Sequence, residues 1–310
     1  MTFLTWASSI VINNNQFVVP DDICTDYHVG AIYCTADSKC HQVYFDAVLG
    51  LARVTTKTFT SIKDTTVRAV WLPKSTKSIG SSAFFRCYSL TSINLPWMVD
   101  SLGDNAFKAC QSLTYINVPR SIKSTGASIF YDCRSLHSLN ISSSVTTIKN
   151  NIFRSCKALS SVHIPSGVEV IENNVFFDCP SLSSVNIPSR VEEIMSATFN
   201  GCNSLITLEL PNGITSIGSG AFRDCYALTN AVVPISVTTI AGDAFGFCNS
   251  LSVIVFLRST PPTSSYNFTG KVLLVPYSSV NAYKAATNYV DATILADTEA
   301  NRKKYGVYSS

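Results

Sequence analysis

One period governs this sequence: between residues 84 and 251, the same three residue types return every 23 positions. A phenylalanine starts each set, a cysteine follows three positions later, and a leucine follows three positions after the cysteine. The phenylalanines are Phe84, Phe107, Phe130, Phe153, Phe176, Phe199, Phe222 and Phe245, and the cysteines are Cys87, Cys110, Cys133, Cys156, Cys179, Cys202, Cys225 and Cys248. A fixed period of this length is typical of stacked repeats, in which each unit buries its apolar side chains against its neighbours. The sequence therefore predicts a solenoid whose interior is lined by columns of phenylalanine, cysteine and leucine.

Each repeat unit combines a strand pattern with a turn pattern. Apolar and polar residues alternate toward Leu95, which is the two-residue period of a half-buried strand. A proline follows this strand in most units, with Ser142 in its place once, and proline ends a ladder because it has no N–H to donate. The spacing from Ala106 to Leu113 predicts a short helical, 3₁₀ or irregular turn with one buried side. Stacked in register, the strands of eight coils would form a parallel sheet about 35–40 Å long.

The repeat divides the chain into three parts. Residues 1–64 do not follow the period and are predicted to form an N-terminal cap, with strands near 17–19 and 31–33. Residues 65–257 form the array, with one degenerate and eight regular units. Residues 258–310 are predicted to form a C-terminal cap with a strand at 271–276, a helix at 280–285 that Ser278 or Ser279 caps, and a solvated charged tail.

The repeat pattern also carries a family resemblance. The segments 187–208 and 210–228 fit Ile-Pro-x-x-Val-x-x-Ile-x-x-x-Ala-Phe-x-x-Cys-x-x-Leu, which resembles the 23-residue leucine-rich repeats of the BspA-like family. Residues 275–284 resemble the end-cap that often follows such arrays, whereas residues 1–64 match no family. The resemblance implies a right-handed solenoid with a concave parallel sheet. It also implies a surface or secreted protein that attaches to host matrix proteins or other cells, with no catalytic residues to carry over.

Composition excludes several classes of partner. The net charge is +3 and charged residues make up 14% of the chain, so no strong field steers it toward nucleic acid or a membrane surface. The apolar run at 253–257 is far shorter than the ~20 residues that cross a bilayer, so no transmembrane helix is expected. The first ten residues lack the cationic region of a signal peptide. This indicates a cytosolic protein, an unusual export route, or a chain whose start has been trimmed.

Cysteine chemistry is the first alternative to a purely structural repeat. One cysteine per coil within an apolar frame favours inert core thiols over cross-coil disulfides or a metal site. Cys24, Cys34 and Cys40 lie outside the repeat. They could form a zinc site together with His41, or one structural disulfide, or stay as free thiols. Their spacing does not resemble the usual zinc pairs. No cofactor is expected, and no sequence motif of a hydrolase, phosphate-binding loop or metalloprotease is present.

The outward positions of the predicted strands form one polar and nearly uncharged face. Serine and asparagine dominate it, and such a surface suits many hydrogen bonds with a glycan or a peptide backbone. Aromatic residues gather near its N-terminal end, where they would act as interface anchors. The candidate binding residues are Trp71, Asn94, Trp97, Tyr115, Asn117, Asn140, His163, Asn186 and Glu209. Two simpler interpretations stay open: a solvated sheet face without a ligand, and a packing role for Trp71 under the cap.

Two functional hypotheses follow. The first is a non-enzymatic, adhesin-like interaction protein that binds a protein or glycan through its concave face. The second is an intracellular scaffold or self-assembling structural protein, with the reduced cysteine column as its evidence. Asn140 and Asn267 each begin an N-glycosylation sequon, and a glycan on Asn140 would stand on the proposed binding face. This position argues mildly against both secretion and use of that face.

Overall fold

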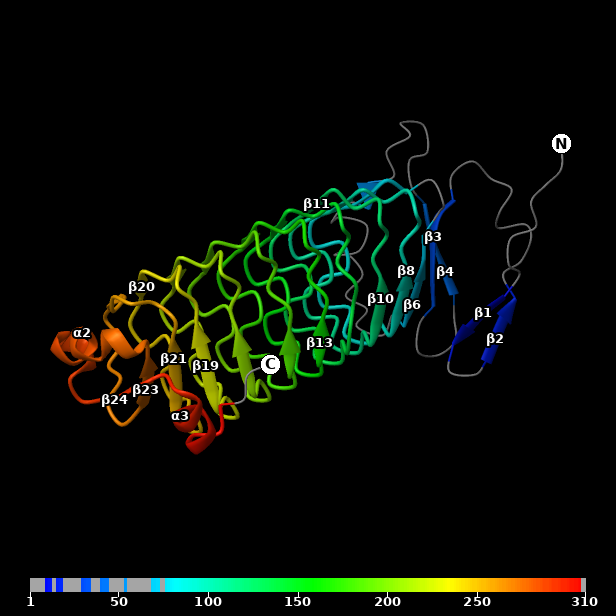
Figure 1. Cartoon of the computed structure of the whole chain (residues 1–310). Coiled ribbons are helices and arrows are strands. Elements are labelled where there is room, and N and C mark those ends of the chain that lie inside the picture. Colours follow the sequence, from blue (N-terminus) through cyan, green and yellow to red (C-terminus); the bar gives the residue numbers. More distant parts are fainter. Residues whose placement is uncertain are drawn as a thin grey trace.

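The structure, a computed structural model, describes the strands at 9–12, 15–18, 29–34, 40–44 and 53–54 together with residues 68–72 and 76–307. These residues include an elongated stack of coils, which runs in Figure 1 from the cyan strands toward the orange and red C-terminal elements. Most coils contribute a strand to a first row and a shorter strand to a second row, and a turn side closes the coil.

The first row of strands is parallel along the array. Its strands are β6 (Ala69–Trp71), β8 (Ser92–Asn94), β10 (Tyr115–Asn117), β13 (Ser161–Val162), β15 (Ser184–Val185), β17 (Thr207–Glu209), β19 (Asn230–Val233), β21 (Val253–Phe256), β23 (Val272–Val275) and β24 (Thr293–Ala296). In β8 and β10, Ser92 lies opposite Tyr115, a register of one 23-residue period. The pairing confirms the predicted solenoid with parallel strands.

The first row is not one continuous sheet, which differs from the predicted eight-coil sheet. One ladder ends at β10 and another begins at β17; between them lie the pair β13–β15 and isolated bridges at Ser138 and Asn140. Proline limits the short strands: Pro96, Pro119, Pro165, Pro188 and Pro211 stand two or three positions after the last strand residue and have no N–H for the ladder. Where Leu257 takes the proline position, its N–H donates to Val233 O at 3.0 Å, and β19 and β21 each reach four residues.

The second row consists of two-residue strands. They are β5 (Arg53–Val54), β7 (Ser78–Ile79), β9 (Ser101–Leu102), β11 (Ser124–Thr125), β12 (Thr147–Ile148), β14 (Val170–Ile171), β16 (Glu193–Ile194), β18 (Ser216–Ile217), β20 (Thr239–Ile240) and β22 (Thr263–Ser264). Their pairs are parallel as well, and β5 pairs with β7. Parallel pairing therefore reaches back to residue 53 in this row.

The turn side of each coil is irregular: no helix, α or 3₁₀, occurs within the described residues 76–276. In one coil, the N–H groups of Asn174, Phe176 and Asp178 donate to carbonyls of the next coil at 3.1, 2.8 and 2.7 Å. Asn174 and Asp178 have φ of 57° and 60°. Asparagine and aspartate tolerate this left-handed region better than most residues. The turns are thus tied to their neighbours by a second hydrogen-bond ladder.

The phenylalanine, cysteine and leucine columns lie inside the stack. The eight phenylalanines are at most 3% exposed, and neighbouring rings stack with centroids 5.0–5.9 Å apart. The widest step, between Phe130 and Phe153, borders a cavity of about 30 Å³ with an almost entirely apolar lining that includes Leu102 and Ile129. Such a void in apolar surroundings stays dry.

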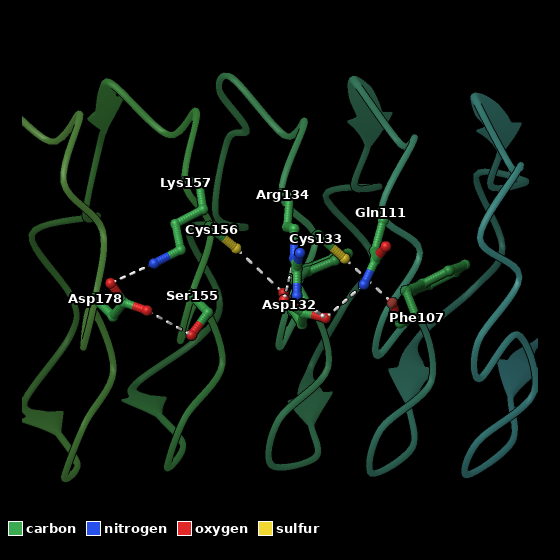
Figure 2. Close-up of polar contacts among 10 residues, drawn as sticks. Phe107, Gln111, Asp132, Cys133, Arg134, Ser155, Cys156, Lys157 and Asp178 are labelled. Atoms are coloured by element: carbon green, nitrogen blue, oxygen red, sulfur yellow. Dashed lines mark hydrogen bonds and ion pairs between the residues drawn. The ribbon is translucent and has the colours of Figure 1, made fainter.

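The column cysteines have a specific structural role that the spacing did not reveal. From Cys110 onward, each thiol donates to the carbonyl of the phenylalanine 26 positions earlier, with S···O distances of 2.9–3.3 Å. Figure 2 shows two of these bonds, including the one from Cys133 to Phe107. The seven cysteines from Cys110 to Cys248 therefore link consecutive coils through hydrogen bonds.

At the N-terminal end, the first row continues into antiparallel strands. β3 (Val29–Cys34) pairs with β6 and with β4 (Cys40–Tyr44), while β1 (Ser9–Ile12) and β2 (Asn15–Val18) pair with each other. The β3–β4 register places Cys34 opposite Cys40. The side chains of Cys24, Cys34, Cys40 and His41 lie outside the described residues, so their chemistry stays a prediction, as does the cap boundary at 64.

At the C-terminal end, the chain forms η3 (Tyr277–Ser279), α2 (Val280–Ala285), η4 (Thr287–Tyr289) and α3 (Glu299–Lys304). The helix predicted at 280–285 is confirmed, although the Ser279 side chain makes no capping bond. The charged segment 297–304, predicted as a solvated tail, contains no buried residue, but most of it forms the helix α3, which Thr298 caps. The following Val307 is only 5% exposed, because it packs against the outward valines of β21.

Candidate functional site

The outward side chains of the first row form a surface that we call the strand face. It carries two ladders whose members follow one another from coil to coil by strand register. One ladder comprises Ser92, Tyr115, Ser138, Ser161, Ser184, Thr207, Asn230 and Val253, and the other comprises Asn94, Asn117, Asn140, His163, Asn186, Glu209, Val232 and Val255. All of these side chains from Ser92 to Glu209 are exposed, so this stretch faces solvent as the strand pattern predicts.

Four side chains of the second ladder are available for a ligand. Within the part of the chain that the structure describes, the side chains of Asn94, Asn117, Asn140 and His163 make no hydrogen bond or ion pair with other residues. Each carboxamide offers two donors and an acceptor, and the imidazole adds a donor and an acceptor. The strand face thus presents one unpaired polar group per coil over four consecutive coils.

These four side chains line a single depression, which we call the Trp97 groove. Its lining residues are Leu72, Asn94, Leu95, Pro96, Trp97, Asn117, Val118, Pro119, Arg120, Ser121, Asn140, Ile141, Ser142, Ser143, His163 and Pro165, and its volume is about 1260 Å³. Arg120 is the only Lys, Arg, Asp or Glu among them. The groove therefore combines neutral hydrogen-bonding groups with apolar surface.

Trp97 stands at the wall of this groove on a fixed backbone. Its side chain is 73% exposed, and Tyr115 on the neighbouring ladder is 55% exposed. The Ser121 hydroxyl of the next coil lies 2.6 Å from Trp97 O and 2.5 Å from Val99 O, so it holds the loop that carries the indole. Exposed aromatic rings on rigid backbone are typical anchors of binding surfaces.

A second depression of about 680 Å³ adjoins the first at His163 and extends to Glu209. Asn186 lies in it but is already engaged: its Nδ2 donates to Ile164 O at 2.8 Å, and its Oδ1 accepts from Ile164 N at 3.1 Å. It supplies the bond that Pro188 cannot give, because Pro188 occupies the position of Leu257 in the later coil. Among the predicted binding residues, Asn186 thus stabilises the coil stack.

The C-terminal end of the strand face is closed by the chain itself. The outward residues Val253, Val255 and Leu274 form an apolar cluster with Val307, and Tyr305 packs beside it. Figure 1 shows α3 folded back beside β21 and β23. The open part of the face therefore ends near Glu209. The Trp71 side chain lies outside the described residues, although its backbone lies opposite Asn94.

The turn side carries a ladder that the sequence analysis missed. Cations and rings alternate at one position of successive coils: Lys108 lies 4.6 Å from the Tyr131 ring centroid, and Arg154 lies 5.5 Å from Tyr131 and 4.2 Å from Phe177. The residues recur every 23 positions, but their type changes from coil to coil, so no identical residue marks the ladder. Such cation–π contacts stabilise exposed sites by about 0.5–1 kcal/mol each.

Next to it, carboxylates bridge neighbouring coils, as Figure 2 shows. Asp132 accepts from Gln111 Nε2 at 2.8 Å and from Arg134 Nε at 2.7 Å, and Asp178 accepts from Ser155 Oγ at 3.1 Å and from Lys157. These groups satisfy one another by hydrogen bonds and ion pairs.

Five of the column thiols, from Cys110 to Cys202, are poorly suited to catalysis or metal binding. Burial raises the pKa of Cys110, Cys133, Cys156 and Cys202, and it raises that of Cys179 to about 12. Nucleophiles and metal ligands need the thiolate, which these surroundings disfavour. Among the described residues, no group of three or more His, Cys, Asp or Glu side chains is arranged to hold a metal ion. In the same part of the chain, no helix is long and apolar enough to cross a bilayer.

The stacked 23-residue coils, the parallel strand row and the buried phenylalanine and leucine columns define a leucine-rich repeat protein. The model of the BspA type leucine-rich repeat region matches residues 52–183 and 169–275, with six copies. The chain therefore belongs to the BspA-type leucine-rich repeat family.

Comparison with one solved structure supports the fold, and two others show weaker similarity. A leucine-rich repeat protein from Bacteroides ovatus is 21% identical with a TM-score of 0.54, over 90% of this chain and 76% of that one. A leucine-rich cell surface protein from Faecalibacterium prausnitzii is 18% identical with a TM-score of 0.41, over 99% and 98% of the two chains. The pneumococcal vaccine antigen PcpA is 14% identical with a TM-score of 0.45, over 75% and 80%. No curated protein is detectably similar to the chain.

Proposed function

We propose that this protein is a non-enzymatic, adhesin-like interaction module that is displayed on a cell surface or secreted. It binds a protein or a glycan, such as a host matrix component or another cell surface, through the open strand face between Ser92 and Glu209. Family membership supports an interaction role. The observation that carries the choice of surface is the Trp97 groove, where four unpaired polar side chains lie beside a 73% exposed indole.

The repeat cysteines do not favour the intracellular alternative. The eight repeat thiols are at most 8% exposed, and seven of them donate to carbonyls. Burial protects thiols from oxidation in any compartment. The burial of these thiols is therefore compatible with export as much as with the cytosol.

Alanine replacements at Trp97, Tyr115, Asn117 and His163 test the proposal. Each side chain is exposed, so each variant should keep a melting temperature close to that of the wild type. The wild type and variants are assayed against a panel of immobilised matrix proteins and glycans. We expect the wild type to capture at least one panel member and the variants to lose at least tenfold in affinity for it. Capture that survives all four replacements would show that the assigned face is wrong.

A further inference from the structure

The Trp97 groove contains a ladder whose spacing is set by the coils. Asn117 lies opposite Asn94, and Asn140 lies opposite His163, so each coil contributes one polar side chain at the same register position. Adjacent strands in a sheet are about 4.8 Å apart. A ligand that lies across the coils therefore meets an equivalent hydrogen-bonding group at every step of about 4.8 Å.

This step discriminates between two kinds of linear ligand. An extended peptide advances about 3.3 Å per residue, so its successive groups fall out of phase with the ladder within two coils. One pyranose ring with its equatorial linkage is close in length to one coil step. In a β-1,4-linked chain successive units are turned over, so hydroxyl groups from alternate edges of the rings face Asn94, Asn117 and Asn140 in turn. A carboxamide can bond either set, because it both donates and accepts.

The chemistry of the groove points to the same ligand. The indole of Trp97 offers a flat apolar face on which the C–H face of a sugar ring can pack, and the carboxamides can donate to and accept from ring hydroxyls. Arg120 is the only Lys, Arg, Asp or Glu in the lining. A polyanion or a strongly charged peptide would find little charge complementarity here.

We propose that the Trp97 groove binds a neutral, linear glycan that runs across the coils with one sugar unit per coil; this rests on the proposed function of the strand face. The glycan is of the extended, β-1,4-linked type. The site accepts four units, because the next side chain of the ladder, Asn186, is already bonded to Ile164.

Two neutral oligosaccharide series, cello-oligosaccharides and chito-oligosaccharides from two to six units, test this proposal. Binding is measured by isothermal titration calorimetry and by the fluorescence of the exposed indole. For at least one series, we expect affinity to rise from the dimer to the tetramer and to stay within about twofold from the tetramer to the hexamer. Heparin-derived oligosaccharides of equal length are the charged comparison and should bind at least tenfold more weakly.

Substitutions assign the binding to the groove. Trp97→Ala should lower the affinity at least tenfold and Asn117→Ala several-fold, whereas Trp97→Phe should retain part of the binding. The matched control is Tyr277→Ala: Tyr277 is 83% exposed and follows Pro276 after β23, as Trp97 follows Pro96 after β8, but no asparagine ladder adjoins it. Tyr277→Ala should bind like the wild type.

The outcomes separate this proposal from the function on which it rests. The glycan proposal is overturned if neither series binds, if Trp97→Ala binds normally, if heparin fragments bind more tightly, or if affinity is independent of chain length. If a matrix protein is captured through the groove while neither series binds, the interaction function stands and only the glycan proposal fails. If no ligand depends on Trp97, both fail.

Discussion

Replacing Phe176 by alanine probes the stacked core most sharply. Its side chain is fully buried, with ring centroids 5.5 Å from Phe153 and 5.3 Å from Phe199. Removing a buried phenylalanine costs about 3–5 kcal/mol, and two close stacked neighbours place this position in the upper half of that range. We expect urea unfolding to show this loss. Because each coil contacts only its neighbours, hydrogen exchange should accelerate first in residues 153–199.

Phe130 provides the matched comparison. Its neighbours lie farther away, at 5.7 and 5.9 Å, and it already borders the cavity of about 30 Å³. Phe130→Ala should therefore cost less than Phe176→Ala, in the lower half of about 3–5 kcal/mol. Tyr277→Ala, at an 83% exposed position, should change stability by less than about 0.5 kcal/mol. A cost below about 1 kcal/mol for Phe176→Ala, or unchanged exchange in residues 153–199, would refute the columnar packing.

Two further predictions concern the thiols and the C-terminal segment. Burial raises the pKa of Cys179 to about 12 from 9.0, so the thiol stays protonated in the native protein while it ionises in the unfolded chain. The unfolded state then binds fewer protons, and the free energy of unfolding falls as pH rises from about 9 to 12, by about 1.4 kcal/mol per thiol and pH unit. Cys179→Ala should flatten this slope in urea titrations at several pH values, and an unchanged slope would contradict the assignment. Deleting residues 299–310 uncovers Val253, Val255 and Leu274. It should lower stability by about 1.5–3 kcal/mol and raise binding of a hydrophobic dye, whereas a variant without extra dye binding would show that the segment does not cover the face.

The columns and the strand pattern were predictable because identical residues recur at one spacing. Phe176, Cys179 and Leu182 each occupy a position that tolerates little change, so the period is visible in the sequence. The turn conformation was less predictable, since its left-handed positions are filled by residues as different as Asn174, Asp178 and Phe247. A sequence pattern cannot reveal a conformation that several residue types share.

From the sequence, the binding site could be predicted only as the outward face of the first-row strands. Strand alternation identified Asn94, Asn117 and Asn140 as outward residues, and the structure exposes them. Alternation does not show what an outward side chain touches, so it did not separate Asn186, which bonds Ile164, from its unpaired neighbours. The folding back of α3 was hidden for a similar reason, because the contact of Val307 with β21 joins residues about 50 positions apart and outside the repeat register.

The proposal that the strand face binds the ligand is tested most directly by a substitution that blocks this face. Asn140→Trp places a bulky side chain in the middle of the Trp97 groove, and Arg134→Trp places the same side chain at an exposed position on the turn side of the same coil. Both proteins are compared with the wild type in capture of the tightest binder from the panel of matrix proteins and glycans. The account predicts that Asn140→Trp abolishes capture and that Arg134→Trp captures normally. Normal capture by Asn140→Trp, or loss of capture only in Arg134→Trp, would contradict it.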